Sequence, residues 1–504
     1  MSSEIELKLS LSPAQARRVA RQPALAGVEP RRQRLTNIYF DTPDLELRRR
    51  GIALRLRRKG GEWLMTVKGG DPAAGALARR AEWEAPTRPG AFDFGIVDDE
   101  SLRAFLAARQ PDLRPVFTTE FTRTAWIVQR GPARVEIALD RGRIAAPGPD
   151  ENAPPAEEAI LEIELELIEG ESSDALFDLA IELACGIHLH PAIDSKADRG
   201  YRLAAGETAA PARADPSPLA RGMTPGDAFR AMALSCLLHL QRNERGVAAG
   251  RDAECLHQAR VAIRRLRSCF RVFAPALAPA FVKVYLPRWR ELGRALGGTR
   301  DWDVFLLETL APLEQAFPGD ASLARLRERG LAVQTAAREA AAVALTGQDY
   351  GRLALAFAAA LYREEPPTFA SAKAARRGLR RFARRRLKKC FAAVKAIARK
   401  PARLDDAAWH RLRIAFKRLR YALEFFAPLL PKKRLRRYRA DLAAILELLG
   451  QFNDQSTAAR LIAELLPPSA PLSVMNGWIA GRKHLLAQTL TESLAGFFAL
   501  RRPW

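Results

Sequence analysis

Charged and apolar residues alternate near the start of the chain, in the run Glu4-Ile5-Glu6-Leu7-Lys8. A period of two predicts a strand that carries its three charged side chains on one face. Residues 161–167 repeat the alternation far downstream, with glutamates as their only charged residues. Taken alone, either strand could belong to a sheet whose polar face lies in water, because antiparallel sheets often have one solvated face.

The segments between these two strands favour a different arrangement. Five further candidate strands place ionisable groups on a single face, and acids and bases mostly occupy separate strands; the positions are Arg55 and Arg57, Lys68, Glu82 and Glu84, Arg123, and Glu136 and Asp140. If this sheet closes, the charges line the inside of a barrel, where unpaired charges are costly. A polyanion held by the basic strands, with divalent cations between it and the glutamates, would satisfy both sets. The pattern therefore predicts a metal-assisted phosphate tunnel.

An ordered set of motifs over about two hundred residues resembles the CYTH family, the triphosphate tunnel metalloenzymes. The set comprises Glu4-x-Glu6-x-Lys8, Tyr39-Phe40-Asp41-Thr42-Pro43, Leu54-Arg55-Leu56-Arg57, Thr66-Val67-Lys68, Glu82-x-Glu84, Arg123, Leu139-Asp140-Arg141-Gly142, Glu162-x-Glu164-x-Glu166 and Ser195-Lys196-Ala197-Asp198-Arg199-Gly200-Tyr201. The resemblance implies an eight-stranded antiparallel tunnel that hydrolyses or transfers tripolyphosphate-type substrates with Mg²⁺ or Mn²⁺.

The resemblance and the residue chemistry together suggest roles for the charged positions. Carboxylates are the ligands that Mg²⁺ prefers, so the predicted metal ligands are Glu4, Glu6, Asp140, Glu162 and Glu164. Glu166 is expected to orient water or to serve a second metal, and Asp140 is a candidate for the same roles. The groups expected to neutralise phosphate oxygens are Arg55, Arg57, Lys68, Arg123 and Lys196, with Glu82 and Glu84 orienting them.

Lys8 is the single cation on its acid-rich strand, and two interpretations of it stay open. Beside several cations or metals its pKa would fall, which would make it a general base for the attacking water. Paired only with Glu4 or Glu6, it would remain an ordinary ammonium group. Tyr39 has two interpretations as well: a hydrogen-bond partner of Lys8, or a structural residue.

Charge is distributed unevenly along the 504 residues. Residues 222–504 carry 50 Lys and Arg against 23 Asp and Glu, a net charge of +27, whereas the whole chain is +24. The first part is therefore slightly acidic, which indicates two domains with different partners. We expect a tunnel domain over residues 1–205, an Ala/Pro/Gly/Ser-rich linker over 206–221, and a basic helical domain over 222–500.

Several classes of protein are disfavoured by the sequence. No apolar run approaches the ~20 residues of a membrane span, and no signal-peptide pattern opens the chain. The five cysteines lack metal-ligand or C-x-x-C spacing, which suggests buried thiols in a reducing cytosol. We therefore expect a cytoplasmic protein, with polyphosphate granules as a location to consider.

The second part of the chain contains an internal repeat. The run from His257 to Arg267 aligns without a gap to the run from His410 to Arg420, at an offset of 153 residues. The segments 296–301 and 449–454 align at the same offset, so one helical unit occurs twice. This pattern resembles the CHAD domain (conserved histidine, α-helical), which implies two pseudo-symmetric four-helix bundles.

Helical periodicity places the basic residues of each copy along one stripe. In the first copy the stripe holds His257, Arg260, Arg264 and Arg267, and in the second His410, Arg413, Lys417 and Arg420. With their neighbours Arg265 and Arg418, these residues form the predicted binding groove for linear polyphosphate. The two histidines are expected to line the groove rather than bind a metal, because no second ligand lies at suitable spacing.

The sequence supports one function best and leaves other functions open. The first is metal-dependent hydrolysis of tripolyphosphate to pyrophosphate and phosphate, with the helical domain holding long-chain polyphosphate. The second is a binding protein of polyphosphate granules, or of nucleic acid, whose tunnel is idle. Nucleic acid is disfavoured because few aromatic residues interleave the stripes. Adenylate cyclase or thiamine triphosphatase activity would share the fold, but no base or thiamine pocket is visible in the sequence.

Overall fold

The computed structural model describes residues 2–69, 76–148, 154–208, 210–250, 252–363, 369, 378–465 and 473–504. The chain divides into two compact units. The first contains residues 1–211 together with 241–245 and 346–365, and the second contains 212–240, 246–345 and 366–504.

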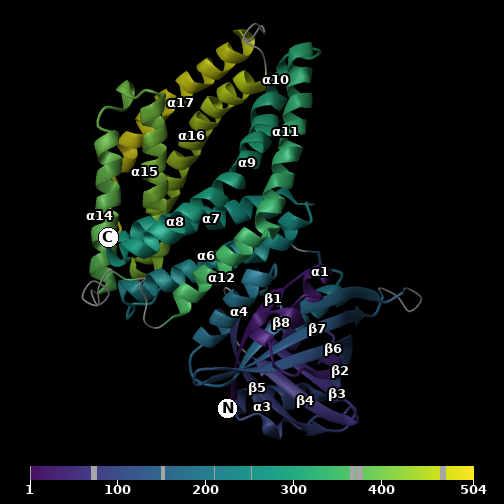
Figure 1. Ribbon diagram of the computed structural model, residues 1–504. Helices are drawn as coiled ribbons and strands as arrows, with labels where there is room; N and C mark the ends of the chain where they lie inside the picture. The colour runs from purple at the N-terminus through teal and green to yellow at the C-terminus, as the bar shows by residue number, and fades with distance from the viewer. Residues whose placement is uncertain are drawn as a thin grey trace. The chain divides into compact units, whose positions relative to one another are not determined.

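A closed antiparallel β-barrel forms the first unit (Figure 1). Eight strands pair in the ring order β1-β5-β4-β3-β2-β6-β7-β8 and back to β1, and the two-residue β9 (His190–Pro191) adds to β1. The predicted eight-stranded tunnel is therefore confirmed. The ring strands are β1 (Ser2–Ser10), β2 (Arg31–Asp41), β3 (Ile52–Lys59), β4 (Glu62–Gly69), β5 (Leu77–Thr87), β6 (Arg114–Arg130), β7 (Ala133–Ala146) and β8 (Ala156–Glu169).

The hydrophobic core of this unit lies largely outside the barrel. Strands β3, β4 and β5 turn Leu54, Val67 and Trp83 outward, where they pack with Leu106 of helix α3 (Glu100–Arg109). Helix α4 (Asp174–Gly186) covers β8, β1 and β7 with its buried leucines and Phe177. Because successive side chains of a strand point to opposite faces, burying the apolar face outside sends the charged face inside.

A helix from much later in the chain completes the first unit. Helix α12 (Gln348–Tyr362) packs against α4 and β9. Tyr362 stacks on Phe177 with ring centroids 5.6 Å apart. At Gly351 an added Cβ would lie 2.4 Å from the carbonyl oxygen of Leu189, so only glycine allows this close approach.

The second unit is helical, and the elements of its two copies follow one another in the same order. The first copy consists of α6 (Pro225–Ala248), α7 (Ala253–Phe273), α8 (Pro279–Ala295), α9 (Gly297–Val304), the π-helical η6 (Phe305–Leu310), α10 (Ala311–Ala316) and α11 (Ala321–Thr346). The second consists of α14 (Leu379–Ile397), α15 (Asp406–Phe425), α16 (Lys432–Leu465) and α17 (Ser473–Ala499). The copies differ where α8, α9, η6 and α10 of the first correspond to the single helix α16.

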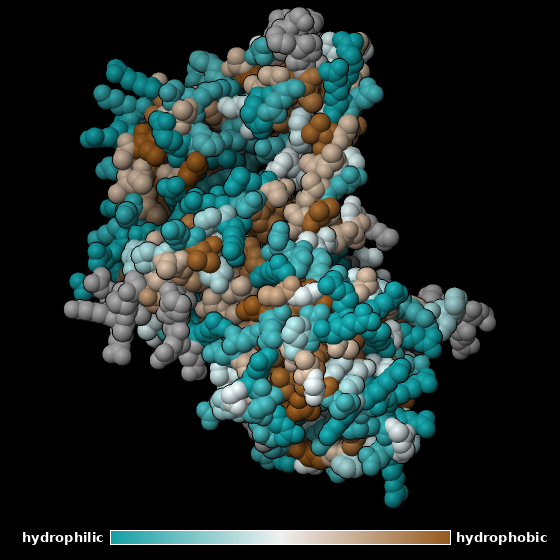
Figure 2. Space-filling view, in the orientation of Figure 1, coloured by the Kyte–Doolittle hydropathy of each residue, from teal (hydrophilic) through white to brown (hydrophobic). Residues whose placement is uncertain are grey.

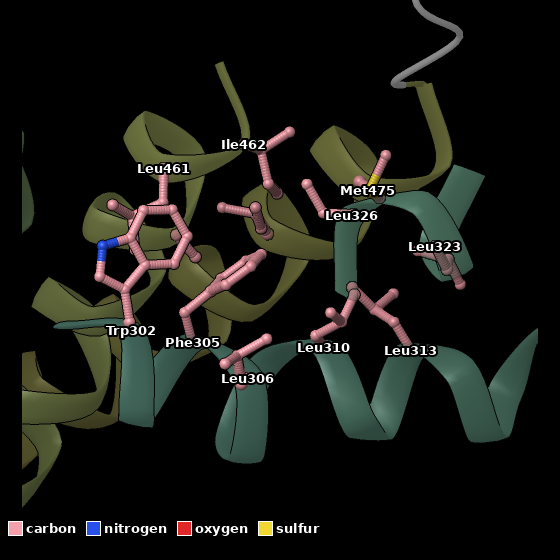
Figure 3. Close-up of a cluster of buried hydrophobic side chains, with 12 residues drawn as sticks. Trp302, Phe305, Leu306, Leu310, Leu313, Leu323, Leu326, Leu461, Ile462 and Met475 are labelled. Carbon is pink, nitrogen blue, oxygen red and sulfur yellow. The ribbon is translucent and has the colours of Figure 1, made fainter. Parts of the chain in front are cut away.

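The two copies share a hydrophobic core (Figure 3). Trp302, Phe305 and Leu310 of the first copy pack against Leu461 and Ile462 of α16. This burial holds the two copies together, because fully burying one large apolar side chain contributes about 1.5–3 kcal/mol.

Hydrophilic residues cover much of the visible surface of each unit (Figure 2). Among the residues that the structure describes, no helix is long and apolar enough to cross a membrane.

Candidate functional site

A cavity of about 400 Å³ lies inside the barrel. Its lining is mainly polar and holds seven cationic side chains and seven carboxylates. The cations are Lys8, Arg55, Arg57, Lys68, Arg80, Arg123 and Lys196, and the carboxylates are Glu4, Glu6, Glu82, Glu84, Glu136, Glu164 and Glu166. The sequence prediction that charges face a closed interior is confirmed at these positions.

Carboxylates crowd together on the side of the cavity formed by β1 and β8. Glu6 faces Glu166 directly across these two strands. Burial, and then the neighbouring charge of Glu4, raise the pKa of Glu166 to about 7. Such repulsion between carboxylates is relieved by a divalent cation, and carboxylate oxygens are what Mg²⁺ or Mn²⁺ would require. Glu4, Glu6 and Glu166 therefore fit a metal of this class.

Cations crowd together on the side formed by β3. Burial, together with the charges of Arg55 and Arg123, lowers the pKa of Arg57 to about 10. The nearest carboxylate to Arg57 is that of Glu84, at 3.9 Å. A guanidinium under this repulsion gains most from an anion that enters the cavity.

The glutamates of β5 and β1 orient the basic groups. Lys68 lies 2.6 Å from Glu4 and 3.3 Å from Glu82, and Arg55 lies 3.6 Å from Glu82. The expectation that Glu82 and Glu84 orient the cations therefore agrees with their positions.

Helix α5 (Lys196–Ala204) delivers one of the cations, and the Ser195-Lys196-Ala197-Asp198 motif explains how. Ser195 caps the helix by accepting from the backbone of Asp198, whose carboxylate accepts from the backbone of Ser195 in return. This capping box fixes Lys196 in the first turn, with its side chain buried at the cavity. At Gly200 an added Cβ would lie 2.1 Å from the ring of Phe117, so glycine is needed for the helix to sit this close.

Three of the predicted metal ligands, Asp140, Glu162 and Glu164, lie together in the structure. Each of Asp140, Glu162 and Glu164 offers an oxygen within 4.8 Å of the others, which is compatible with a metal. However, the Lys196 amine already lies among them, at 2.7, 2.5 and 2.9 Å, and Arg123 binds Asp140 at 2.7 Å. Asp140 and Glu162 are also absent from the cavity lining and almost fully buried. In this structure Asp140 and Glu162 pair with Lys196 and Arg123, and their role as metal ligands stays a prediction.

The sequence left two interpretations open for Lys8 and two for Tyr39, and the neighbours of each residue in the structure bear on the choice. Lys8 lies 2.9 Å from Glu6 and 2.8 Å from Glu164. Although burial opposes its charge, these carboxylates hold its pKa well above the ordinary lysine value, which favours the interpretation of Lys8 as an ammonium group. Tyr39 stacks on Phe117 at 4.4 Å and lies beside Arg55, not in a hydrogen bond to Lys8.

Sequence reasoning missed one cation of the cavity, Arg80. It lies opposite Glu4 in the pairing of β1 with β5. Its Nε is buried without a hydrogen-bond partner, and among the described residues it is the one lining cation with no carboxylate within 4.0 Å. Arg80 has the same strand parity as Glu82 and Glu84, and that signal could have identified it.

In the second unit the two predicted stripes meet. Arg264 of α7 donates to the hydroxyl of Tyr421 on α15 at 2.6 Å. Burial, followed by the charges of Arg413 and Arg264, lowers the pKa of Lys417 to about 6. Burial lowers the pKa of Arg260 to about 10, with Arg264 and Arg300 adding repulsion. The eight residues predicted to line a binding groove are called the central groove below: His257, Arg260, Arg264, Arg267, His410, Arg413, Lys417 and Arg420.

Two neighbours of the stripes behave differently from each other. Arg265 is 1% exposed and pairs with Glu424 at 2.7 Å, so it belongs to the core and is wrongly placed in the predicted groove. Its counterpart Arg418 is exposed and lies near Arg271.

The two histidines of the stripes also have different surroundings. His410 donates from Nδ1 to Asn453 at 2.8 Å. Burial lowers the pKa of His257, which has Arg300 nearby.

Two families match this chain. Residues 2–201 match the CYTH domain, and residues 231–463 match the CHAD domain. Among curated proteins, an inorganic triphosphatase of Haemophilus influenzae is 32% identical over 209 residues, which cover 40% of this chain. The matched segment spans about half of that relative, 55% of its length.

Solved structures give two further similarities. The CHAD domain of the plant Ricinus communis is 34% identical, with a TM-score of 0.47, over 58% of this chain and 99% of the plant domain. A Hippeastrum protein described as having a dominant triphosphatase activity is 18% identical, with a TM-score of 0.30, over 41% of this chain and 97% of that one. At these TM-scores neither similarity bears on function.

Proposed function

This chain joins a CYTH domain to a CHAD domain, and we propose that it is a metal-dependent hydrolase that splits tripolyphosphate into pyrophosphate and phosphate. The observation that carries the proposal is that like charges of both signs lie close together inside the barrel. Cations repel one another around Arg57, and carboxylates repel one another around Glu166, within a single cavity. A phosphate chain with a divalent cation relieves both.

The balance of charges indicates the form in which the substrate binds. Seven cations and seven carboxylates make the described lining neutral overall when all are ionised. A bare triphosphate carries several negative charges and would leave the carboxylate side unrelieved. A metal–triphosphate complex has a small net charge and an internal separation of charge that matches the lining.

Each group of residues contributes to the reaction in its own way. Arg55, Arg57, Lys68 and Arg123 hold the phosphate oxygens and stabilise the charge that gathers on them in the transition state. Glu166, with its raised pKa, is placed to take the proton of the attacking water. Glu4 and Glu6 would hold the metal, and the metal supplies positive charge between the carboxylates and the phosphate.

The central groove of the helical unit supports a second part of the proposal, binding of long-chain polyphosphate. Its cations face other cations across α7 and α15, so an anion relieves repulsion along the whole stripe. A linear chain of phosphates offers a charge at each step of such a stripe. Nucleic acid is the weaker candidate, because few aromatic side chains interleave these cations for base stacking.

A phosphate-release assay on tripolyphosphate with Mg²⁺ tests the enzymatic proposal. We compare the unaltered chain with Glu4→Ala and Arg57→Ala, using Arg58→Ala as the control because Arg58 is exposed on the same strand. We expect both cavity variants to lose nearly all activity and the control to keep it. Equal rates in all four proteins would favour the competing interpretation, a polyphosphate-binding protein with an idle tunnel.

Including ATP and thiamine triphosphate as substrates addresses the related activities of this fold. Polar side chains outnumber apolar ones in the described cavity lining, where Ala53, Phe121 and Ala197 are the apolar residues. We therefore expect tripolyphosphate to give the highest kcat/KM of the three.

A further inference from the structure

Asn37 lies at the centre of a row of polar side chains that crosses three strands of the barrel. It is opposite Arg57 in the pairing of β2 with β3, and opposite Thr119 in the pairing of β2 with β6. It has the same strand parity as Gln33 and Tyr39, which line the cavity. Asn37 and Thr119 are both fully buried. Because directly opposite side chains on neighbouring strands lie within reach of each other, the row joins one cation of the cavity to two neutral polar groups.

Two hydrogen bonds run along this row. Arg57 donates from Nε to Asn37 Oδ1 at 2.8 Å, and Asn37 donates from Nδ2 to Thr119 Oγ1 at 2.8 Å. A guanidinium has donors only, so the amide oxygen has to face Arg57, and the amide nitrogen then faces the threonine hydroxyl. The bond at Nε fixes the direction of the guanidinium and leaves its two Nη groups for other partners.

Most other cations of the cavity are held by carboxylates. Those with a carboxylate oxygen within 3.6 Å are Lys8, Arg55, Lys68, Arg123 and Lys196. Arg57 is held instead by a neutral amide, and Glu84 Oε2 lies 3.9 Å from its Nη1. That same carboxylate oxygen accepts a hydrogen bond from the hydroxyl of Thr66 at 2.7 Å. Glu84 is therefore held by Thr66 at a distance longer than a hydrogen bond from Arg57.

An amide and a carboxylate can both orient a guanidinium, but they differ in what they leave for a substrate. A carboxylate at hydrogen-bond distance also neutralises the positive charge. An amide has no net charge, so the charge of Arg57 stays available to an anion that enters the cavity. Burial, with the repulsion from Arg55 and Arg123, lowers the pKa of Arg57 to about 10, as expected for a cation without a close counter-ion.

We propose that Asn37 is a positioning residue of the tunnel, which aims Arg57 at the phosphate chain and, because it is neutral, leaves the full charge of the guanidinium to the substrate. This inference rests on the proposed function, since it takes phosphate oxygens as the partners of Arg57. It requires an uncharged hydrogen-bond acceptor at position 37. A carboxylate of the same shape should therefore impair the enzyme more than a shortened side chain does.

Asn37→Asp and Asn37→Ala separate the effect of charge from the effect of orientation. Aspartate has the shape of asparagine and can accept from Arg57 Nε with one oxygen and from the Thr119 hydroxyl with the other, so both hydrogen bonds are kept and the charge changes. Alanine removes both hydrogen bonds and leaves Arg57 charged. A purely structural asparagine would tolerate aspartate better than alanine, whereas the proposal requires the opposite order of activity.

The full-length variants are compared by tripolyphosphate hydrolysis with Mg²⁺ and by calorimetric affinity for a non-hydrolysable triphosphate analogue. We expect Asn37→Ala to lower kcat/KM about tenfold, as for the loss of one hydrogen bond to a charged group. Asn37→Asp should lower it about tenfold further, because its charge repels the substrate. The affinity for the analogue should fall in the same order, although the melting temperature of Asn37→Asp should equal or exceed that of Asn37→Ala. Thr36→Asp adds the same charge to the opposite face of β2 and, as the matched control, should keep both rate and affinity.

A double variant tests whether Asn37 acts through Arg57, and it also serves if Asn37→Asp does not fold. In the Arg57→Ala background, Asn37→Ala should lower kcat/KM less than about twofold, because the group that it positions is gone. The inference alone is overturned if Arg57→Ala loses activity but Asn37→Asp is at least as active as Asn37→Ala. It is also overturned if Thr36→Asp loses as much activity as Asn37→Asp, or if Asn37→Ala has the same effect with and without Arg57. An unaltered chain that neither hydrolyses tripolyphosphate nor binds the analogue would overturn the proposed function as well.

Discussion

The tunnel and the central groove both gather cations, but they balance them differently. In the tunnel, lysines and arginines lie beside carboxylates, as Lys196 does at 2.5–2.9 Å from three acids. In the groove, burial and then the charges of Arg413 and Arg264 lower the pKa of Lys417, and the opposing effect of Asp454 is smaller. The tunnel is therefore largely neutralised by itself, whereas the groove keeps a net repulsion.

This difference bears on what each site can bind. A neutral cavity with separated charges suits a complex of metal and phosphate, and its internal pairs hold the cations in fixed positions before the substrate arrives. A groove of mutually repelling cations suits a bare polyanion and needs no metal. The two sites should respond in opposite ways to metal removal and to the loss of a cation.

The largest effect is expected in the tunnel. Arg57→Ala removes a cation that has no carboxylate closer than 3.9 Å and is therefore available to the substrate. We expect kcat/KM for tripolyphosphate to fall about 10²–10³-fold, which is the typical effect of losing one preorganised group that stabilises transition-state charge. Binding of long-chain polyphosphate, measured by calorimetry on the same variant, should not change. A parallel loss of both would contradict the separation of the two sites.

The groove should show the next largest effect. Replacing Arg264 and Arg413 with Gln removes two facing cations from α7 and α15, so we expect polyphosphate affinity to fall about tenfold or more. Tripolyphosphate hydrolysis should stay within about twofold of the unaltered chain. The matched control replaces Arg436 and Arg439, which are exposed on α16, and keeps the net charge equal to that of the test variant. Equal losses of polyphosphate affinity in both variants would show that the affinity depends on net charge and not on the groove residues.

Arg80 allows a further test of which tunnel cations bind the substrate. Because it has no carboxylate partner among the described residues, Arg80→Ala should raise KM for tripolyphosphate about tenfold with a smaller change in kcat. Arg80→Lys should restore part of the loss. Arg79→Ala is the control, because Arg79 is the adjacent residue on β5 and is exposed. An unchanged KM in Arg80→Ala would show that Arg80 is not a substrate ligand.

The smallest effect concerns stability. The pKa of Lys417 is about 6 in the folded chain and near 10.4 in an unfolded one, so between these values the unfolded state binds more protons and stability rises with pH. Lys417→Met removes this dependence and should raise the melting temperature at pH 6–7 by about 2–4 °C, as expected for ~1 kcal/mol in a unit of this size. Differential scanning calorimetry from pH 6 to 9 measures both changes. A lower melting temperature in Lys417→Met would contradict the repulsion inferred for the groove.

Much of the tunnel was predictable because a strand fixes the face of each side chain by parity. The alternation of charged and apolar residues in β1, β3 and β8 predicted which groups point inward, without any knowledge of how the strands pair. The placement of Asp140 and Glu162 was not predictable in this way. Parity puts them on the inner face, but only the position of α5 reveals that Lys196 occupies the space between them.

The repeat gave a similar mixture of success and failure. Helical periodicity predicted the stripes, because residues three or four apart share a face. It could not distinguish Arg265 from Arg418, which occupy equivalent positions. Arg265 is buried because Glu424 pairs with it, and the residue equivalent to Glu424 in the first copy is Arg271, so Arg418 has no corresponding acid. A contact between copies decides the burial, and such contacts are not visible in local sequence.

The metal dependence of binding tests the central claim most directly. Calorimetric titrations of the full chain compare a non-hydrolysable triphosphate analogue and long-chain polyphosphate, each with Mg²⁺ and with a chelator. We predict that the analogue binds tightly only with Mg²⁺, that Glu4→Gln abolishes this gain, and that polyphosphate binds equally well in both conditions. Tight, metal-independent binding of the analogue that survives Glu4→Gln would contradict the account of a neutral tunnel built for a metal–triphosphate complex.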